Sequence, residues 1–398
     1  MEQQSLKSNI WKFAIILITN KRIFAAILAA YYLTIPDVTA QTIGFILLAG
    51  NIAGFLLEIP SGYVSDKLGH KEAMVLSKIL LIVSTLFFLF AEETSFLVLG
   101  AIFLSFGQSF MSGTGAAFMH ETLRGLGREN DYTRVMGKVS SIGFAVPIVL
   151  TVLIPFLIGI SFKAPFIVAL VSDIIGLIFA TALVKPKVSQ EQVDEIGVTN
   201  FKQVIQAGYK LGFFKYALFM SVIAGLLFSV GIFRAPYQLV LGVPVIYFGV
   251  LFGIGRALAS LLLAYSGKIK DFFSDILSLY KFQIILYGGL ITLMGLTENV
   301  LAILIIFIIL NGFQWGFRQV NLGFMLEIIN DSKFKATLLS TQQQINLIIQ
   351  GVTSALLGII ITQTSYSFAF LCLGISLLVL STPIYLFIKS KHKAAGVS

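Results

Sequence analysis

Gly62-Tyr-Val-Ser-Asp66-Lys-Leu-Gly69-His-Lys71 is a short polar stretch between two long apolar runs near the N-terminal end of the chain. Ten residues are too few to form a domain. Glycine, aspartate and basic residues together are typical of a turn that joins two membrane helices at the cytoplasmic surface. The stretch therefore predicts a tight hairpin between two helices that cross a membrane.

The composition of the whole chain also indicates a membrane protein. Of its 398 residues, 57% are hydrophobic and 12% are charged, whereas soluble domains contain about 25% charged residues. Only helices and closed barrels satisfy their backbone polar groups inside a bilayer, and a helix needs about 20 apolar residues to cross it. The apolar runs of this chain have the length of helices rather than strands.

We expect an all-α integral membrane protein with twelve transmembrane helices. The predicted spans are residues 13–35, 41–64, 73–91, 96–119, 137–159, 164–184, 213–235, 245–266, 276–296, 299–320, 337–362 and 366–388. No A-x-A-like cleavage site follows a short apolar segment at the start, so the first span is expected to be retained. Cys372 is the only cysteine, which excludes an internal disulfide.

The basic residues that give the chain its net charge of +9 are divided unevenly between the two sides of the predicted topology. Counted loop by loop, one side of the predicted topology carries nearly all of the lysines and arginines, and the other side carries only Lys163. By the positive-inside rule, both termini are predicted to be cytoplasmic, and the expected location is the plasma membrane. The natural partners of such a basic belt are anionic lipid headgroups rather than nucleic acid.

The longest polar stretch between spans divides the chain into two halves. We predict an N-terminal six-helix half at residues 1–184, a cytoplasmic linker at 185–212 and a C-terminal six-helix half at 213–398. The second part of the linker could be an amphipathic helix on the inner surface or a mobile tether. A weak echo of Gly62-x3-Asp66 in Gly267-x3-Asp271 suggests related halves, as in transporters that bind substrate at the midplane.

The motif Gly62-x-x-x-Asp66-x-x-Gly69-x-Lys71 resembles the loop 2–3 signature of the major facilitator superfamily. Glu58-Ile-Pro-Ser-Gly62 and Lys335-Ala-Thr-Leu-Leu-Ser340 resemble patterns in a bacterial branch described as drug exporters. With the twelve spans and the central linker, the resemblance covers essentially the whole chain. It implies the fold of that superfamily and secondary transport by alternating access.

The resemblance also implies a latch at the cytoplasmic side. Glycine lets neighbouring helices approach, and a carboxylate is stabilised at a helix N-terminus or beside an arginine. In the family such an aspartate contacts the start of helix eleven and a cation after helix four. The gating residues expected here are Gly62, Asp66, Gly69, Lys71, Thr337 and either Arg124 or Arg128. The alternative is that Asp66 only caps a turn.

Two departures from the family pattern limit what the resemblance implies about protons. Leu99-Gly-Ala101-Ile-Phe-Leu104 lacks the arginine that many proton-coupled members carry early in helix four. Gly143-Phe-Ala-Val-Pro147 replaces the Gly-Pro pattern that is common in helix five of antiporters. Proton exchange is therefore a default assumption taken from the family.

Polar residues inside the spans predict a substrate site. A charge at the bilayer centre costs at least ~2.5–3.5 kcal/mol, so each one needs a partner, water or a function. Arg318 recurs with three other polar or amphipathic residues of span ten on one helical face. The substrate-binding residues expected are Asn51, Gln108, Arg256, Asn311, Gln314, Trp315, Arg318, Gln343, Asn346 and Gln350. For the single amides, interhelical hydrogen bonding is the alternative.

A buried carboxylate is the simplest proton carrier, and the candidates are Glu58, Glu121 and Asp173. The alternative for Asp173 is a partner in an interhelical contact, and for the other two it is a contact in the latch with Arg124 or Arg134. Lys21 and Arg22 mark either a helix start near residue 20 or a charged pair that enters the cavity. Arg234 is expected to extend to the outer surface.

The leading hypothesis is a secondary active transporter that exports an amphiphilic or anionic small organic compound, with protons as a candidate coupling ion. Importing a nutrient anion is the first alternative, and a membrane-embedded lipid-modifying enzyme is the second. The sequence has no Walker motif and no metal-ligand spacing of its three histidines. We therefore expect a monomer that is not an enzyme and that needs neither a metal nor a cofactor.

Overall fold

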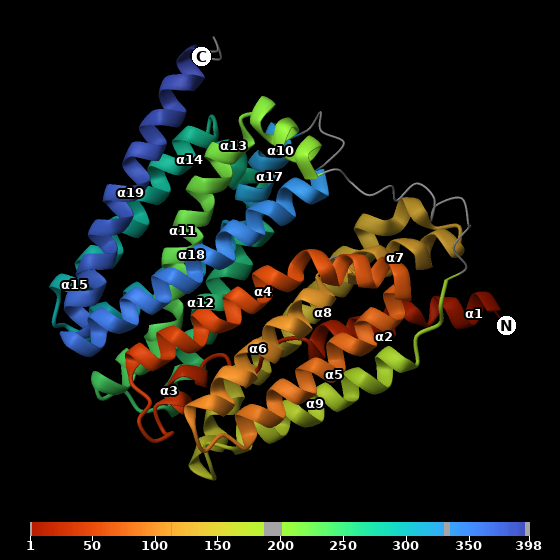
Figure 1. The fold of residues 1–398 in the computed structure, drawn as a ribbon, viewed down its shortest axis with the longest axis horizontal. Coiled ribbons are helices and arrows are strands. Elements are labelled where there is room, and N and C mark those ends of the chain that lie inside the picture. Colours follow the sequence, from red (N-terminus) through yellow and green to blue (C-terminus); the bar gives the residue numbers. More distant parts are fainter. Residues whose placement is uncertain (1, 113, 187–200, 330–334, 395–398) are drawn as a thin grey trace. The chain divides into compact units, whose positions relative to one another are not determined.

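The computed structural model describes residues 2–112, 114–186, 201–329 and 335–394, and the regular elements in them are all helical (Figure 1). Those of the N-terminal half are α1 (Glu2–Lys7), α2 (Asn9–Thr19), α3 (Leu28–Tyr32), α4 (Ala40–Leu68), α5 (His70–Leu89), α6 (Thr94–Met111), α7 (Thr114–Gly125), η1 (Glu129–Asp131), α8 (Tyr132–Leu153), η2 (Ile154–Gly159) and α9 (Ala164–Thr181). The remainder are α10 (Phe201–Lys210), α11 (Phe213–Val240), α12 (Ile246–Ala264), α13 (Ser266–Phe272), α14 (Ile276–Gln283), η4 (Ile284–Gly288), α15 (Gly289–Leu296), α16 (Val300–Gly316), α17 (Arg318–Ile328), α18 (Lys335–Gln363) and α19 (Tyr366–Ala394).

Eleven helices of the described residues are long and apolar enough to cross a membrane, and they correspond to the second to twelfth predicted spans. The first predicted span, residues 13–35, is not one helix. It consists of α2 and the short α3, with a break from Asn20 to Ile27. The break contains Arg22, whose side chain turns to a buried carboxylate. The first predicted span therefore corresponds to two short helices, and neither is among the eleven candidate spans of the described residues.

The chain divides into two compact units, Met1–Asp37 with Ala49–Val198, and Val38–Leu48 with Thr199–Ser398. The second unit thus includes the first turns of α4, which the sequence prediction placed in the N-terminal half. These turns approach the backbone of α18, because a Cβ on Gly44 would lie 2.5 Å from the Ser354 carbonyl oxygen. The backbone N–H of Gln41 also donates a hydrogen bond of 2.9 Å to Thr362 Oγ1.

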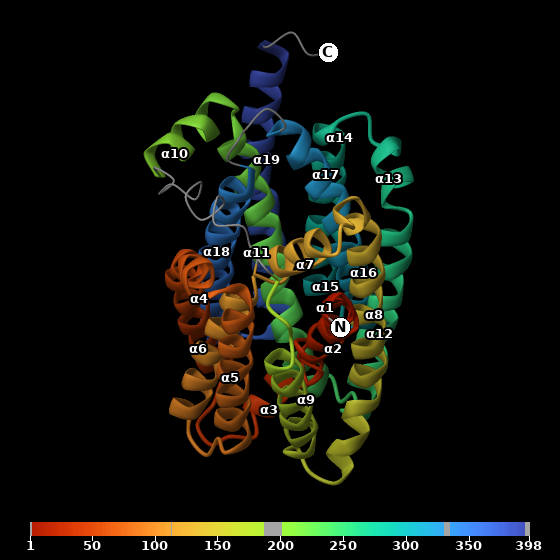
Figure 2. The ribbon, with the colours of Figure 1, turned by 90° about the vertical axis from the view of Figure 1, so that its right-hand side faces the viewer.

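In the first unit, α5 is the central element. It packs against α6, as Figure 2 shows, and against α9. Glycines allow the close approach to α6, since an added Cβ on Gly100 would meet the Phe88 ring and one on Gly107 would meet Leu81. Phe88 also lies within a buried aromatic cluster with Phe24 and Phe166.

In the second unit, α12 packs against α16 and α11 packs against α18. Added Cβ atoms on Gly255 and Gly312 would meet Asn311 and Leu258 respectively, so small residues again set the helix spacing. The predicted linker helix is present as α10, with Val204 fully buried and Gly208 close to Leu338. Residues 187–200 of the linker lie outside the described residues.

The predicted hairpin at residues 62–71 is shorter than expected. Helix α4 continues to Leu68 and α5 begins at His70, so Gly69 alone forms the turn. Its φ of 106° and ψ of 146° belong to a region that is nearly restricted to glycine. A Cβ at this position would also lie 2.6 Å from Glu72 Oε2.

We therefore expect Gly69→Ala to destabilise the protein by about 1–3 kcal/mol, because the strained backbone and the contact with Glu72 both oppose a side chain. Thermal unfolding in detergent measures the effect. Gly62→Ala is the matched control, since Gly62 is helical and nothing lies within 4 Å of an added Cβ. Equal melting temperatures for the two variants would contradict this account of the turn.

Candidate functional site

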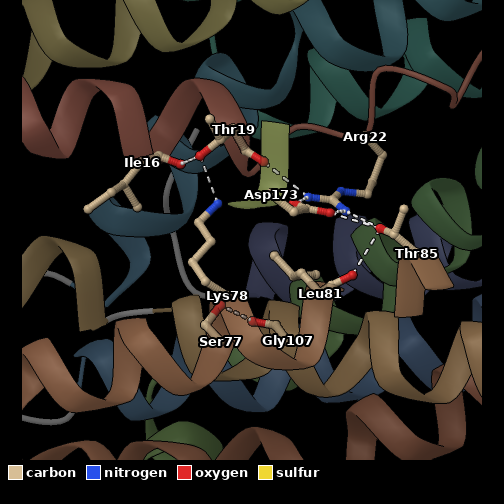
Figure 3. Close-up of polar contacts among 9 residues, drawn as sticks. All are labelled: Ile16, Thr19, Arg22, Ser77, Lys78, Leu81, Thr85, Gly107 and Asp173. Atoms are coloured by element: carbon tan, nitrogen blue, oxygen red, sulfur yellow. Dashed lines mark hydrogen bonds and ion pairs between the residues drawn. The ribbon is translucent and has the colours of Figure 1, made fainter. Parts of the chain in front are cut away.

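The first candidate site is a buried ion pair in the first unit, drawn in Figure 3. Arg22 lies just after the end of α2, and Asp173 is a fully buried residue of α9. The Arg22 guanidinium donates to both carboxylate oxygens, from Nη2 to Oδ1 at 2.6 Å and from Nη1 to Oδ2 at 2.9 Å. Thr85 Oγ1 lies 2.8 Å from Asp173 Oδ2. This bidentate geometry is the strongest form of such a pair.

Lys78 adds a second cation beside this pair (Figure 3). Its side chain is fully buried, and its ammonium donates a hydrogen bond of 3.0 Å to Thr19 Oγ1. Gly176 of α9 makes room for it, since a Cβ there would lie 3.0 Å from Lys78 Nζ. No ion pair of Lys78 is found among the residues that the structure describes.

The charges in this cluster do not balance. Arg22 and Lys78 are two basic groups, and Asp173 is the carboxylate that both of them face. The Asp173 oxygens already accept from Arg22 and Thr85. A buried charge without an anion is costly, so the cluster can respond to the loss or gain of a charge. It provides an ion-sensitive centre within the first unit.

The second candidate site is a pair of arginines around one phenylalanine in the second unit. The guanidinium carbon of Arg234, on α11, lies 4.7 Å from the centre of the Phe252 ring. That of Arg256, on α12, lies 4.8 Å from the same ring and 4.1 Å from the centre of the Trp315 ring on α16. Aromatic faces stabilise guanidinium groups but do not neutralise them. Two positive charges therefore converge on a small volume.

Unsatisfied amides accompany these arginines in the same unit. Gln238 on α11 is fully buried, and neither its Oε1 nor its Nε2 has a hydrogen-bond partner. The Oδ1 atoms of Asn311 and Asn346 are also buried without a partner. Buried polar atoms are normally paired, so these amides have free capacity to bind a polar ligand. They are candidates for contacts with polar groups of a ligand in the second unit.

A third polar cluster lies around the turn at Gly69, within the first unit. Ser65 Oγ lies 2.9 Å from His70 Nδ1, and Thr114 Oγ1 donates to Ser65 Oγ at 2.9 Å. His70 Nε2 lies 3.2 Å from Glu121 Oε1. This chain of contacts ties the end of α4 and the start of α5 to α7. The side chain of Asp66, the predicted latch, lies outside the described residues.

The loop after α7 satisfies its own charges. Arg124 donates to Glu129 Oε1 at 3.0 Å, and this hydrogen bond holds the pKa of Glu129 below its usual value. Arg128 pairs with Asp131 at 2.8 Å. Both arginines predicted to receive Asp66 therefore have acidic partners close by in sequence.

Comparison with known proteins decides the family. Residues 11–333 match the family model described as Major Facilitator Superfamily. The chain belongs to the major facilitator superfamily. With its eleven helices that are long and apolar enough to cross a membrane, this major facilitator protein is a multi-pass membrane protein.

Individual relatives are distant. The chain is 24% identical over 195 residues to an uncharacterised MFS-type transporter, YxaM, of Bacillus subtilis (strain 168). That match covers 49% of this chain and 48% of YxaM, so the chain spans about half the length of the curated relative it matches.

Solved structures agree with the fold. The crystal structure of the nucleoside transporter NupG is 13% identical, with a TM-score of 0.74 over 96% of this chain and 99% of that chain. A bacterial homologue of the human lysosomal transporter Spinster, in an inward-facing and occupied conformation, is 13% identical with a TM-score of 0.72 over 97% and 96%. At this identity the likeness shows the major facilitator fold alone.

The predicted substrate residues of this major facilitator protein fall in both units. Asn51 is buried and Gln108 is exposed in the first unit. In the second unit, Gln350 is buried, Gln314 and Asn346 are half-buried, and Gln343 is exposed. Arg318 is exposed and begins α17, because α16 ends at Gly316. Phe317 alone separates α16 from α17, and Val300–Ile328 together form one helix long and apolar enough to cross a membrane, so Arg318 stays a predicted substrate residue.

The proton candidates have identified neighbours. Asp173 is held by Arg22 and Glu121 by His70, whereas Glu58 accepts a hydrogen bond of 3.1 Å from Ser112 Oγ. None of these contacts shows a proton being carried. They do assign an interhelical partner to Asp173, which was the alternative role for this residue.

Two predictions about basic side chains were wrong, and two further residues were missed. Arg234 does not extend to a surface, because its side chain is only 4% exposed and packs on Phe252. Lys78 was counted with the lysines and arginines of the predicted cytoplasmic side, but it is fully buried. Gln238 and Phe252 gave no separate signal, although Gln238 lies four residues after Arg234 and hence on the same helical face.

Proposed function

We propose that this transporter exports an amphiphilic or anionic small organic compound by alternating access, as a secondary active carrier in the plasma membrane. The observation that carries the proposal is Arg256, which lies against Trp315 and Phe252 and makes no ion pair among the residues that the structure describes. A charge at such depth requires an anion or water.

The protein supplies no carboxylate from the helices around Arg256. The sequences of α11, α12, α16 and α18 contain neither Asp nor Glu. A substrate anion would therefore neutralise a charge that these helices leave uncompensated. The guanidinium matches a carboxylate, sulfonate or phosphate group, and the aromatic faces favour an apolar or aromatic body.

Proton coupling is the second part of the proposal. The ion-sensitive centre of the first unit, with Arg22, Lys78 and Asp173, supports it because one proton would change the balance of its charges. Glu58 and Glu121 stay candidates because each carboxylate has a polar neighbour, Ser112 and His70 respectively. We propose protons as the coupling ion in exchange for the substrate.

Uptake and efflux by purified protein in proteoliposomes test the proposal. The vesicles carry an imposed pH gradient and a pooled panel of organic anions, lipophilic cations and sugars. We expect an organic anion to move against its gradient when the pH gradient is present. Movement of lipophilic cations alone would contradict the anion site, and accumulation in the opposite direction would favour the import of an anion.

The gate is a further proposal, with Asp66 as the latch residue and Gly62, Gly69, Lys71, Thr337 and either Arg124 or Arg128 as its other members. Asp66→Asn keeps the size of the side chain but removes its charge. We expect slower turnover at normal expression, because a weaker latch changes the rate of alternation between states. Initial rates at saturating substrate measure this. A rate equal to that of the unaltered protein would contradict a gating role for Asp66.

A further inference from the structure

A groove on the first unit is not used by the proposed transport cycle. It has a volume of about 470 Å³ and lies between α2 and α8. Its apolar lining includes Ile10 and Ala14 from α2 and Val139 and Ile142 from α8, and its basic lining includes Arg134 and Lys138.

Along α8 the two basic lining residues lie near the start of the helix, where Val135 also lines the groove, and the lining beyond Lys138 is apolar. Arg134 and Lys138 come first, and Ile142 follows one turn further on. At 1.5 Å per residue, Arg134 and Ile142 are separated by about 12 Å along the helix axis. The order of charge and then hydrocarbon is that of an amphiphile with an anionic head and an apolar tail.

The two basic side chains at the head of the groove are free to bind an anion. Both are exposed, and neither makes an ion pair among the described residues. Arg128, which also lines the groove, differs because it is paired with Asp131. Arg134 and Lys138 are four residues apart on one helix, where like charges repel each other. An anionic group between them would relieve this repulsion.

Trp11 marks the groove as an interfacial feature. It lines the groove, and 52% of its side chain is exposed. Its ring is nevertheless held in place by an edge-to-face contact with Phe179, with a distance of 5.4 Å between the ring centres. Tryptophan is enriched where the hydrocarbon of a bilayer meets its headgroups.

We propose that this groove binds an anionic glycerophospholipid. The phosphate lies between Arg134 and Lys138, and one acyl chain runs along Val139 and Ile142. A free phosphate would bind the basic residues but leave the apolar lining exposed. A neutral lipid would cover the apolar lining but leave the two basic residues without an anion. The basic end of the groove is on the side predicted to face the cytoplasm, so the lipid belongs to the inner leaflet.

The position of Trp11 allows a direct test with the full-length protein. The chain has two tryptophans, so Trp315→Phe leaves Trp11 as the sole tryptophan, which is excited selectively at wavelengths that tyrosine does not absorb. Phosphatidylglycerol and phosphatidylcholine with brominated acyl chains are titrated into the purified protein in mixed micelles. Bromine quenches tryptophan only on close approach. We expect brominated phosphatidylglycerol to quench Trp11 at a mole fraction at least about tenfold lower than brominated phosphatidylcholine needs. Two basic residues near an anionic headgroup provide an attraction of this order.

Matched variants in the Trp315→Phe background separate the groove from general surface charge. Arg134→Gln with Lys138→Gln should abolish the preference for phosphatidylglycerol. Lys389→Gln with Lys391→Gln removes the same charge from exposed positions on α19, and this variant should keep the preference for phosphatidylglycerol. Size-exclusion profiles confirm that each variant is folded.

Three results would overturn the proposal. The first is equal quenching by the two lipids, and the second is a preference that survives in the Arg134→Gln and Lys138→Gln variant. The third is displacement of phosphatidylglycerol by millimolar glycerol phosphate, which would identify a free phosphate as the ligand.

Discussion

Asp173→Asn is expected to lower the free energy of unfolding by about 3–5 kcal/mol, the usual cost of removing one partner from a buried ion pair. Arg22 would lose both of its carboxylate contacts while most of its side chain stays out of solvent. Lys78 would lose the carboxylate that it faces. The Arg22 guanidinium, which does not give up its proton, would then remain without an anion. Thermal unfolding of the purified protein in detergent measures the loss.

Paired substitutions show whether an unbalanced charge causes the loss of stability in Asp173→Asn. Arg22→Met with Asp173→Leu removes both partners and should be much less harmful than Asp173→Asn alone. Adding Lys78→Met to Asp173→Asn should restore part of the stability. Glu298→Gln, at an exposed acid, serves as the control for loss of a carboxylate. If Asp173→Asn matched this control, the ion pair would not hold the first unit together.

Arg256→Gln is expected to reduce transport of an organic anion by about 10–100-fold, since a hydrogen bond to a charged group contributes about 1.5–3 kcal/mol. Arg256→Lys should recover only part of the rate, because an ammonium cannot reproduce the planar, bidentate guanidinium. Rates over a range of substrate concentrations separate weaker binding from slower turnover. The expected change is mainly in KM.

Lys268→Gln is the control for Arg256, since it removes an exposed positive charge from the neighbouring helix α13. It should transport the anion normally. The protein with Arg256→Gln should also keep the melting temperature of the unaltered protein or exceed it, because a half-buried charge without an ion pair is lost. Normal anion transport by Arg256→Gln would contradict the proposal that Arg256 binds the substrate anion.

The fold could be predicted from the sequence because the bilayer imposes a simple pattern. Apolar runs of helix length and the motif at Gly62 indicate the helices and the family, and the family model and the solved structures agree. The first span was predicted as one helix because hydropathy does not show a break. Arg22 leaves the helical path to reach Asp173, which lies 151 residues later in the chain.

The candidate sites could be predicted only in part, because the sequence pattern of one helix does not show which other helices pack against it. Arg256 was identified because a charge in the middle of an apolar span is conspicuous. Arg234 and Lys78 lie closer to the ends of their spans, where an exposed position is equally compatible with the sequence. Their burial depends on Phe252 in one case and on Gly176 in the other, and both come from different helices. Such packing is not encoded in local periodicity.

Counterflow in proteoliposomes tests most directly whether this is a carrier of organic anions. Vesicles are loaded with a high concentration of one unlabelled organic anion, with no ion gradient, and diluted into a trace of the same labelled anion. A carrier that alternates between two states should accumulate the label transiently above equilibrium, and Arg256→Gln should abolish this overshoot. An overshoot with lipophilic cations or sugars but with no anion of the panel would contradict the account.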